Sequence, residues 1–118
     1  GLCLVGSEMC IRDRFKDLGS TELGIWSAHG EGRFKLPKSE SEYNIVGKYS
    51  NSTFPTNPNG SDYDTAILSS KDGRHIAMMP HLERSTFPWN WGFYPRHKIS
   101  DDVSPWIYAF VNAYNWLK

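Results

Sequence analysis

A histidine and a glutamate two positions apart, His81 and Glu83, are the residues of this chain best suited to acid–base chemistry. They lie in the segment MMPHLER, residues 78–84, directly after an apolar run over residues 74–79. An imidazole can take up and release a proton near neutral pH, and a neighbouring carboxylate can fix its tautomer. The pair therefore predicts a general base oriented by an acid. A polar turn with a hydrogen-bonded histidine would give the same pattern.

A second group of polar side chains occurs in AHGEGR, residues 28–33, where two glycines free the backbone to turn tightly. Its candidates for chemistry are His29, Glu31 and Arg33. One interpretation is a metal site, since His and Glu are common ligands, but the chain has no His-x-x-x-His or Glu-x-x-His spacing to support it. Another interpretation is anion binding, because the Arg33 guanidinium could clamp a phosphate or a carboxylate.

Nucleophilic catalysis would need a Cys or a Ser in addition to His81 and Glu83. Between residues 15 and 118 there is no G-x-[CS]-x-G elbow of the kind that exposes a nucleophile. The segment GLCLVG at residues 1–6 comes near this pattern, but its second glycine is one position late. The residues between 15 and 118 therefore supply a base and an acid, and they leave the nucleophile open.

Four short apolar runs predict strands, and one tight turn predicts how two of them pair. Asp72 and Gly73 separate the last two runs, which is a hairpin signal. Pro80 lacks an amide donor, so we expect the final strand to end just before His81, where open α/β sheets place their chemistry. The predicted strands are residues 24–28, 43–49, 65–69 and 74–79.

One amphipathic helix should close the chain. Ser104 followed by Pro105 reads as an N-cap with proline at the first helical position. Apolar residues then recur at three- and four-residue spacings, namely Trp106, Ile107, Phe110, Ala113, Tyr114 and Leu117. Several strands with a single helix fall short of a complete α/β domain, whose parallel strands need crossover helices. We therefore predict part of an α/β domain with an incomplete central sheet.

Composition excludes some classes of function and leaves others open. The 118 residues fit one domain, and Lys plus Arg balance Asp plus Glu at 13 each. A net charge of zero gives no support to a nucleic-acid or membrane-surface partner. No apolar run approaches the roughly 20 residues that span a bilayer. The two cysteines, Cys3 and Cys10, form no framework of pairs, which favours a cytoplasmic protein.

The first 14 residues differ in character from the rest of the chain. The run GSEMCIRDR at residues 6–14 resembles a translated sequencing-adapter read-through. We therefore predict that residues 1–14 are non-native, that the native chain begins near Phe15, and that neither cysteine belongs to it. The alternative is a genuine short strand followed by a turn.

Four motifs in one order carry a family resemblance: AHGEGR at 28–33, NPNGS at 57–61, DGR at 72–74 and MMPHLER at 78–84. With SPW at 104–106 and the closing helix, they resemble the carboxyl-terminal end of the glutaminase domain in the phosphoribosylformylglycinamidine synthase (formylglycinamide ribonucleotide amidotransferase) family. The resemblance covers about residues 23–118. Any one motif alone would be weak, whereas the ordered set is specific.

The resemblance implies that residues 15–118 are the carboxyl-terminal fragment of a class I, triad-type glutaminase with a three-layer α/β/α fold. In that family a Cys attacks the side-chain amide of glutamine. His81 would activate the thiol and protonate the leaving ammonia, and Glu83 would hold the imidazole. His29, Glu31 and Arg33 would support the glutamine site or a domain interface.

The resemblance also implies the fate of the ammonia. It passes to synthetase domains of the same full-length chain, which use ATP and magnesium to convert formylglycinamide ribonucleotide to its amidine in purine biosynthesis. No cofactor is expected in this fragment itself. The cytoplasm is the expected location of such a protein.

The chain departs from the family pattern in three respects. Leu82 stands where the family has proline between the His and the Glu. The family's nucleophile elbow lies well upstream of the HGEGR motif, so Cys3 is not assigned as the nucleophile and the fragment alone should be inactive. The synthetase domains are absent from the sequence. Two alternatives stay open, a glutaminase domain of another triad amidotransferase and a non-catalytic interaction module built on the aromatic segment 87–94.

Overall fold

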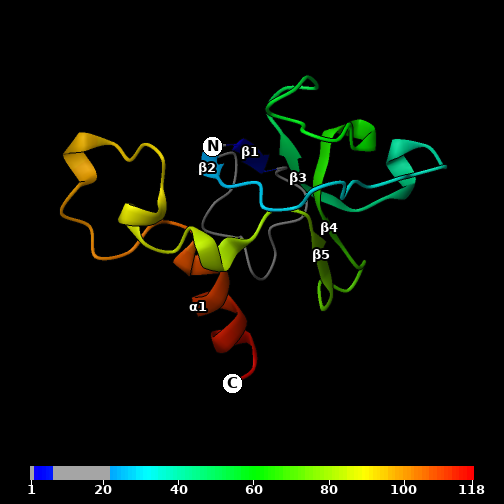
Figure 1. Ribbon diagram of the computed structural model, residues 1–118. Coiled ribbons are helices and arrows are strands. Elements are labelled where there is room, and N and C mark those ends of the chain that lie inside the picture. The colour runs from blue at the N-terminus through cyan, green and yellow to red at the C-terminus, as the bar shows by residue number, and fades with distance from the viewer. Residues whose placement is uncertain (1, 7–21) are drawn as a thin grey trace.

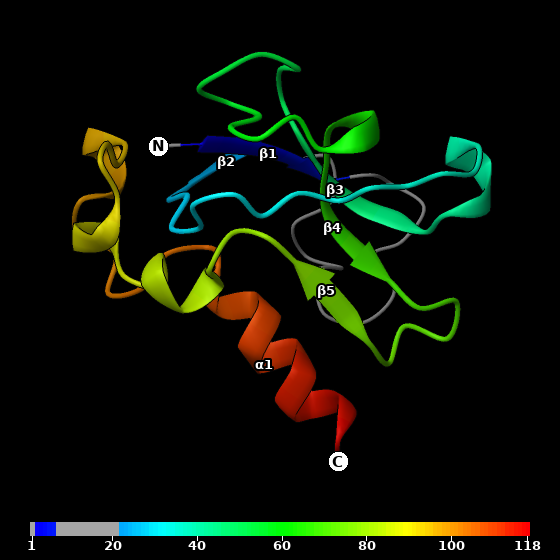
Figure 2. The ribbon, with the colours of Figure 1, turned by 45° about the vertical axis from the view of Figure 1, so that its right-hand side comes forward.

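The computed structural model describes residues 2–6 and 22–118, and side chains from residue 23 onward. Its centre is one five-stranded antiparallel sheet with the strand order β2-β1-β3-β4-β5 (Figure 1). The strands are β1 (Leu2–Gly6), β2 (Glu22–Ile25), β3 (Ile45–Tyr49), β4 (Thr65–Ser69) and β5 (Ile76–Met78). The helix α1 (Ile107–Trp116) ends the chain below the sheet in Figures 1 and 2. Short 3₁₀ turns lie at η3 (Glu40–Glu42), η4 (Asp62–Asp64), η5 (Leu82–Arg84), η6 (Pro88–Asn90) and η7 (Arg96–Lys98).

The hairpin predicted from Asp72 and Gly73 is confirmed. Asp72 Oδ1 accepts a hydrogen bond from the Arg74 amide at 3.1 Å, and Gly73 has a φ of 72°, which glycine adopts at no steric cost. The pairing of β4 with β5 continues one residue beyond β5, because the Met79 amide donates to the Ala66 carbonyl at 3.1 Å. Pro80 then ends the pairing, as expected.

The predicted strand at 24–28 forms only in part, because β2 ends at Ile25. The sheet explains where β2 ends. Ile25 pairs with Leu2, the first described residue of β1, and the described pairing between the two strands ends there. In β3, Gly47 lies where the register with β4 shifts, and a Cβ there would meet the Ile67 side chain at 2.9 Å. This glycine therefore allows a close approach between neighbouring strands.

The first strand falls within the segment that the sequence assigns to adapter sequence. The backbone of β1 pairs with β2 on one side and β3 on the other, with Val5 opposite both Glu22 and Lys48. Residues 7–14 lie outside the described residues. A strand here agrees with the alternative of a genuine short strand. Pairing geometry does not bear on the origin of these residues, so the non-native segment stays a prediction.

All strand pairs in the described part of the chain are antiparallel, which corrects one step of the sequence argument. The rule that places chemistry at the carboxyl ends of strands belongs to parallel sheets, so it does not locate His81 here. Instead, His81 follows an edge strand and begins a turn. The fold class is α/β, with a small sheet and a carboxyl-terminal helix as predicted. Among residues 22–118, α1 is the one α-helix, and it lacks the length to cross a membrane.

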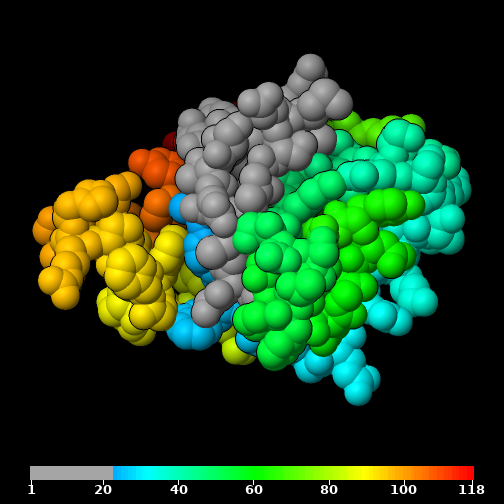
Figure 3. Space-filling model, turned by 90° about the horizontal axis from the view of Figure 1, so that it is seen from above, coloured from blue at the N-terminus to red at the C-terminus, as the bar shows by residue number. Residues whose placement is uncertain are grey.

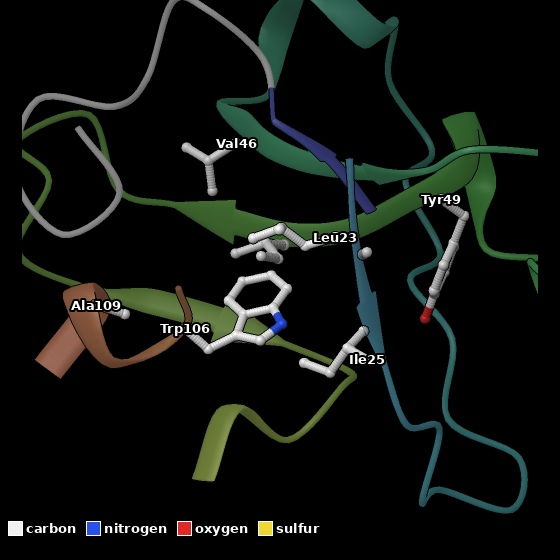
Figure 4. Close-up of a cluster of buried hydrophobic side chains, with 8 residues drawn as sticks. Leu23, Ile25, Val46, Tyr49, Trp106 and Ala109 are labelled. Atoms are coloured by element: carbon white, nitrogen blue, oxygen red, sulfur yellow. The ribbon is translucent and has the colours of Figure 1, made fainter. Parts of the chain in front are cut away.

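The core joins β2, β3 and β4 to the start of α1. Trp106 is only 3% exposed, and its indole points toward Leu23 and Ile25 of β2 (Figure 4). The same ring donates from Nε1 to the Gly24 carbonyl at 2.9 Å, so one side chain provides both apolar contact and a hydrogen bond to β2. The cluster comprises Leu23, Ile25, Val46, Tyr49, Ala66, Ile67, Trp106 and Ala109.

The predicted closing helix is confirmed, and its predicted apolar stripe is buried at Trp106 but exposed at Phe110, Tyr114 and Leu117. The buried positions are Trp106, Ala109 and Asn112, which recur every three residues. Phe110 and Leu117, assigned to the apolar stripe, are exposed. Apolar residues occur all around this helix, so their spacing alone does not select the face that meets the small sheet. Ser104 Oγ accepts a hydrogen bond from the Trp106 amide at 3.3 Å, as expected of a capping serine. The helix itself begins one residue later, at Ile107.

Between β5 and α1 the chain forms a lobe over residues 85–103, which projects from one end of the molecule (yellow and orange in Figure 3). Its two ends are tied together at the base. The Ser104 amide donates to the Thr86 carbonyl at 2.8 Å, and Ser104 Oγ donates to the Ser85 carbonyl. Trp91 Nε1 donates to the same Ser85 carbonyl at 2.9 Å. The residues that directly follow Glu83 are therefore fixed to the start of α1.

Candidate active site

His81 and Glu83 form the hydrogen-bonded pair that their spacing predicts. His81 Nδ1 lies 2.7 Å from Glu83 Oε1, and the two side chains are 43% and 61% exposed. A carboxylate can only accept a hydrogen bond, so Nδ1 carries the proton of the neutral ring. Nε2 then keeps its lone pair and can accept a proton from another group. The pair has the geometry of a base held in one tautomer by an acid.

Local packing explains how a turn holds this pair. Pro80 is buried, and the backbone then turns through η5, with the Arg84 amide donating to the His81 carbonyl at 3.2 Å. Leu82, between the two polar residues, packs against the hydrophobic core. This contact anchors the turn while His81 and Glu83 remain partly exposed on either side of it. Leu82 thus occupies the family's proline position without separating the pair.

The electrostatic surroundings favour an ionised Glu83. A hydrogen bond from its own backbone amide lowers the pKa of the Glu83 carboxyl below its usual value, and the hydrogen bond with His81 lowers it further. At neutral pH the carboxylate is therefore charged. It can stabilise the imidazolium that forms whenever His81 takes up a proton.

The HGEGR segment lies beside this pair, as its proposed role requires. A Cβ built on Gly32 would lie 3.0 Å from Met79 Sδ and 3.2 Å from the ring of His29. The Gly32 backbone is therefore packed against both residues, and Met79 is two positions before His81. Burial lowers the pKa of His29, the charge of His81 lowers it further, and a hydrogen bond with the Met79 backbone raises it.

The NPNGS loop holds the HGEGR segment in place. Asn59 Nδ2 donates to the Gly32 carbonyl at 3.0 Å, and the Phe34 amide donates to Ser61 Oγ at 3.0 Å. The Leu36 amide donates to Asp62 Oδ2 at 2.8 Å. These three hydrogen bonds hold residues 32–36 against the loop. The sequence analysis identified this loop only as one of the motifs that carry the family resemblance.

The other two candidates in this segment, Glu31 and Arg33, lie at the surface. Both side chains are exposed, and Arg33 Nη1 reaches the Asn59 carbonyl at 3.5 Å. Neither contacts the His81–Glu83 pair through a hydrogen bond or ion pair that the structure records. Ser27, which the sequence argument missed, has its hydroxyl 3.5 Å from His29 Nδ1. Its position two residues before the histidine was the only signal for it.

An apolar pocket of about 530 Å³ opens between β2 and the lobe, and neither His81 nor Glu83 lines it. Its walls include Trp26, Trp91 and Phe93, together with Ser85, two residues beyond Glu83. Gly92 lies against Trp26, because a Cβ on this glycine would be 2.9 Å from the indole. Part of the aromatic segment 87–94 therefore forms one wall of this pocket.

The described residues offer neither a metal-binding cluster nor a cysteine side chain. Among the described residues, no three His, Cys, Asp or Glu side chains cluster closely enough to hold a metal ion. Residues 22–118 contain no cysteine, and the side chain of Cys3 in β1 is not among those described. The described site thus consists of a base, its acid and a supporting loop, and the nucleophile stays open.

Comparison with known proteins identifies the family. The family model of the CobB/CobQ-like glutamine amidotransferase domain matches residues 13–117. The chain belongs to this glutamine amidotransferase family. The match begins at residue 13, inside the segment 1–14, so it does not decide where the native chain starts.

Similar proteins narrow the relationship within this glutamine amidotransferase family. The chain is 41% identical over 106 residues to the phosphoribosylformylglycinamidine synthase of Homo sapiens, with 80% of the chain and 8% of that protein covered. It is 39% identical over 109 residues to that of Drosophila melanogaster, at 80% and 8% coverage. For Dictyostelium discoideum the identity is 39% over 117 residues, at 83% and 8%. The chain thus spans under a tenth of the length of these relatives.

Proposed function

We propose that this chain is part of a glutaminase that supplies ammonia for the ATP-dependent conversion of formylglycinamide ribonucleotide to formylglycinamidine ribonucleotide in purine biosynthesis. The observation that carries the proposal is the 2.7 Å contact between His81 Nδ1 and Glu83 Oε1. The family of glutamine amidotransferases supports glutamine as the substrate. The names of the similar synthases support the pathway.

In the proposed reaction a cysteine thiol, supplied from outside residues 22–118, attacks the side-chain amide carbon of glutamine. His81 takes the thiol proton at Nε2 and passes it to the nitrogen of the leaving ammonia. Water then attacks the thioester carbon and gives its proton to His81, and the thiolate leaves as glutamate is released. Throughout these steps Glu83 holds Nδ1 and stabilises the charged ring.

His29, Glu31 and Arg33 have supporting roles in this proposal. Gly32 packs on Met79, which brings the HGEGR segment close to the residue that lies two positions before His81. This packing favours a role beside the glutamine site. The exposed Glu31 and Arg33 suit contact with another domain of the full-length chain, because charged side chains commonly form the rim of such interfaces.

The synthetase half of the reaction belongs to other domains in this proposal. Those domains would bind ATP and magnesium, as the family resemblance implies. The partners are glutamine and these synthetase domains of the same chain, with no nucleic acid or membrane involved. The balanced charge supports this choice of partners, and the proposed location is the cytoplasm.

The test is His81→Ala in the full-length enzyme, with glutamine and ammonium compared as nitrogen sources. We expect glutamine-dependent activity to fall by roughly 10⁴–10⁶, on the scale of losing a member of a catalytic triad. Ammonium-dependent activity should be retained, because the synthetase domains do not use His81. The control is His75→Ala, at an exposed histidine next to the β4–β5 turn. Full glutamine-dependent activity in His81→Ala would contradict the proposal.

A further inference from the structure

The contact between His81 and Glu83 is not held by burial of its own side chains. They are 43% and 61% exposed, although their polar atoms lie 2.7 Å apart. Their positions therefore depend on the backbone of the η5 turn, which the Arg84 and Ser85 amides close by donating to the His81 and Leu82 carbonyls. One isolated 3₁₀ turn has little stability of its own. The turn needs anchors at both of its ends.

The Ser85 carbonyl is the anchor at the carboxyl end of this turn. It accepts two hydrogen bonds from residues distant in the sequence, one from Ser104 Oγ and one from Trp91 Nε1 at 2.9 Å. A carbonyl oxygen has two lone pairs, so both of its acceptor positions are used. Ser85 and Ser104 are each only 1% exposed, and water therefore does not easily replace a donor that is lost here.

Ser104 joins this anchor to the core of the molecule. Its hydroxyl donates to the Ser85 carbonyl and accepts the Trp106 amide at 3.3 Å, so the group uses both its donor and an acceptor position. Its own amide donates to the Thr86 carbonyl at 2.8 Å. Trp106 in turn donates from Nε1 to the Gly24 carbonyl of β2 at 2.9 Å. One serine thus connects the residues that follow Glu83 to both the helix and the sheet.

We propose that Ser104 is a positioning residue for the His81–Glu83 pair. The sheet fixes the start of the turn, because the Met79 amide donates to the Ala66 carbonyl at 3.1 Å, and the Ser104 hydroxyl fixes its end. Without this hydroxyl, Glu83 is free to move relative to His81 Nδ1. The catalytic meaning of this role rests on the proposed function, whereas its effect on the geometry of the pair can be measured without any reaction.

The first experiment measures the tautomer of His81 in the 118-residue chain, from the nitrogen resonances of the ring at pH 8. We expect the wild-type ring to carry its proton on Nδ1, because Glu83 accepts that proton. Ser104→Ala should lose this preference in favour of the Nε2–H form, and Ser104→Thr, which keeps the hydroxyl, should retain it. An unchanged tautomer in folded Ser104→Ala would overturn the proposal.

The matched control for this measurement is Ser85→Ala. The Ser85 hydroxyl makes no hydrogen bond with any described residue, and the substitution leaves the Ser85 carbonyl in place. The tautomer of His81 should therefore stay as in the wild type. A loss of the Nδ1–H form as large as in Ser104→Ala would overturn the assignment, because any lost hydroxyl near the turn would then have the same effect.

Trp91→Phe provides a second, independent variant, which carries the test if Ser104→Ala does not fold. It removes the other donor to the Ser85 carbonyl and keeps an aromatic ring. We expect the same shift toward the Nε2–H tautomer of His81, and a larger shift when both donors are removed. A wild-type tautomer in folded Trp91→Phe would contradict the claim that the Ser85 carbonyl fixes the pair.

The second experiment compares nitrogen sources in the full-length enzyme. We expect Ser104→Ala to lower glutamine-dependent kcat by about tenfold to 10²-fold, the scale of a misplacement of up to about 1 Å, and to retain ammonium-dependent activity. The control is Ser69→Ala, which removes a hydroxyl that donates to the Ser70 carbonyl at the turn end of the β4–β5 hairpin. An equal loss of both activities in Ser104→Ala would overturn the positioning role, while a wild type without glutaminase activity would instead refute the proposed function.

Discussion

Asn59 donates a hydrogen bond from Nδ2 to the Gly32 carbonyl at 3.0 Å, which joins two loops 27 residues apart in the sequence. Gly32 in turn packs on Met79, just before the His81–Glu83 turn. Three segments that are separate in the sequence therefore form one contiguous site. The loop that contains Asn59 holds the HGEGR segment in place, and the contribution of this loop to stability can be tested.

The stability of this loop depends on Asn57, which is buried and uses both ends of its amide. Its Nδ2 donates to the Ser61 carbonyl at 3.1 Å and to Asp64 Oδ1 at 2.9 Å, and its Oδ1 accepts the Ser61 amide at 2.9 Å. We expect Asn57→Ala to lower the free energy of unfolding by about 1–3 kcal/mol, because these partners lose their hydrogen bonds inside the protein. Urea denaturation of the chain measures the change.

The control for this prediction is Asn51→Ala. Asn51 also accepts hydrogen bonds from its own turn, namely from the amide and the hydroxyl of Thr53, but it is exposed. Water can replace those bonds, so the cost should stay within about 0.5 kcal/mol. Equal destabilisation by the two variants would show that Asn57 has no special role in stabilising the NPNGS loop.

A second prediction concerns the close contact between Gly92 and Trp26. A methyl group on Gly92 would lie 2.9 Å from the indole, which is fixed by a hydrogen bond from Nε1 to the Asn90 carbonyl. Gly92→Ala should therefore cost about 1–3 kcal/mol, the range for overpacking, and shift Tm downward. Gly30→Ala is the matched control, since a Cβ there meets nothing within 4 Å. A stability of Gly92→Ala equal to that of Gly30→Ala would mean that the lobe moves freely relative to β2.

The third prediction is the pH dependence of the His81–Glu83 hydrogen bond. The pKa of Glu83 is below its ordinary 4.5, so the carboxylate form is favoured in the folded chain. The resulting stabilisation is present above pH 4.5 and is lost as the pH falls through the lower folded value. We expect the resonance of the His81 Nδ1 proton to show the hydrogen bond from pH 5 upward and to lose it in more acidic solution. A hydrogen bond that disappears already between pH 6 and 5 would contradict a lowered pKa of Glu83.

Glu83→Gln tests the same bond in catalysis. An amide can donate as well as accept, so it does not enforce the Nδ1–H tautomer and carries no charge to stabilise imidazolium. In the full-length enzyme we expect glutamine-dependent kcat to fall by roughly 10³–10⁴, as when the orienting acid of a triad is neutralised. Glu42→Gln, at an exposed glutamate of η3, provides the comparison. A loss of similar size in both variants would remove the special role of Glu83.

Sequence reasoning was most accurate where one local rule decides the structure. Asp72 and Gly73 gave the hairpin because few residues adopt the positive φ that the turn needs. Pro80 gave the end of β5 because it has no amide to donate. The His81–Glu83 contact also needs only a short turn, so two-residue spacing sufficed to predict it.

Features that depend on distant parts of the chain were not predictable in this way. The buried face of α1 depends on which side meets β2, and the apolar residues on its other sides gave a misleading pattern. The end of β2 depends on its pairing with β1. The contact of His29 with the site requires Asn59, Gly32 and Met79 to come together, and nothing local to any of them indicates this.

The last prediction concerns Trp106, which links the helix to the strand that leads into HGEGR. Its buried indole packs in the core and donates from Nε1 to the Gly24 carbonyl at 2.9 Å. Trp106→Ala should lower the free energy of unfolding by about 3–5 kcal/mol, since it creates a large cavity. Trp106→Phe keeps most of the apolar volume but removes the donor, and should cost about 1–3 kcal/mol.

The control for Trp106 lies on the same helix. Trp116 is half exposed, and its ring has the Arg74 guanidinium 5.7 Å from its centroid, so Trp116→Ala should cost only about 1 kcal/mol. Urea denaturation followed by circular dichroism compares the three variants. If Trp106→Ala were no more harmful than Trp116→Ala, α1 would not be docked on β2, and the helix could not fix the lobe that follows Glu83. Greater damage at Trp106, with Phe intermediate, is the order that the contacts require.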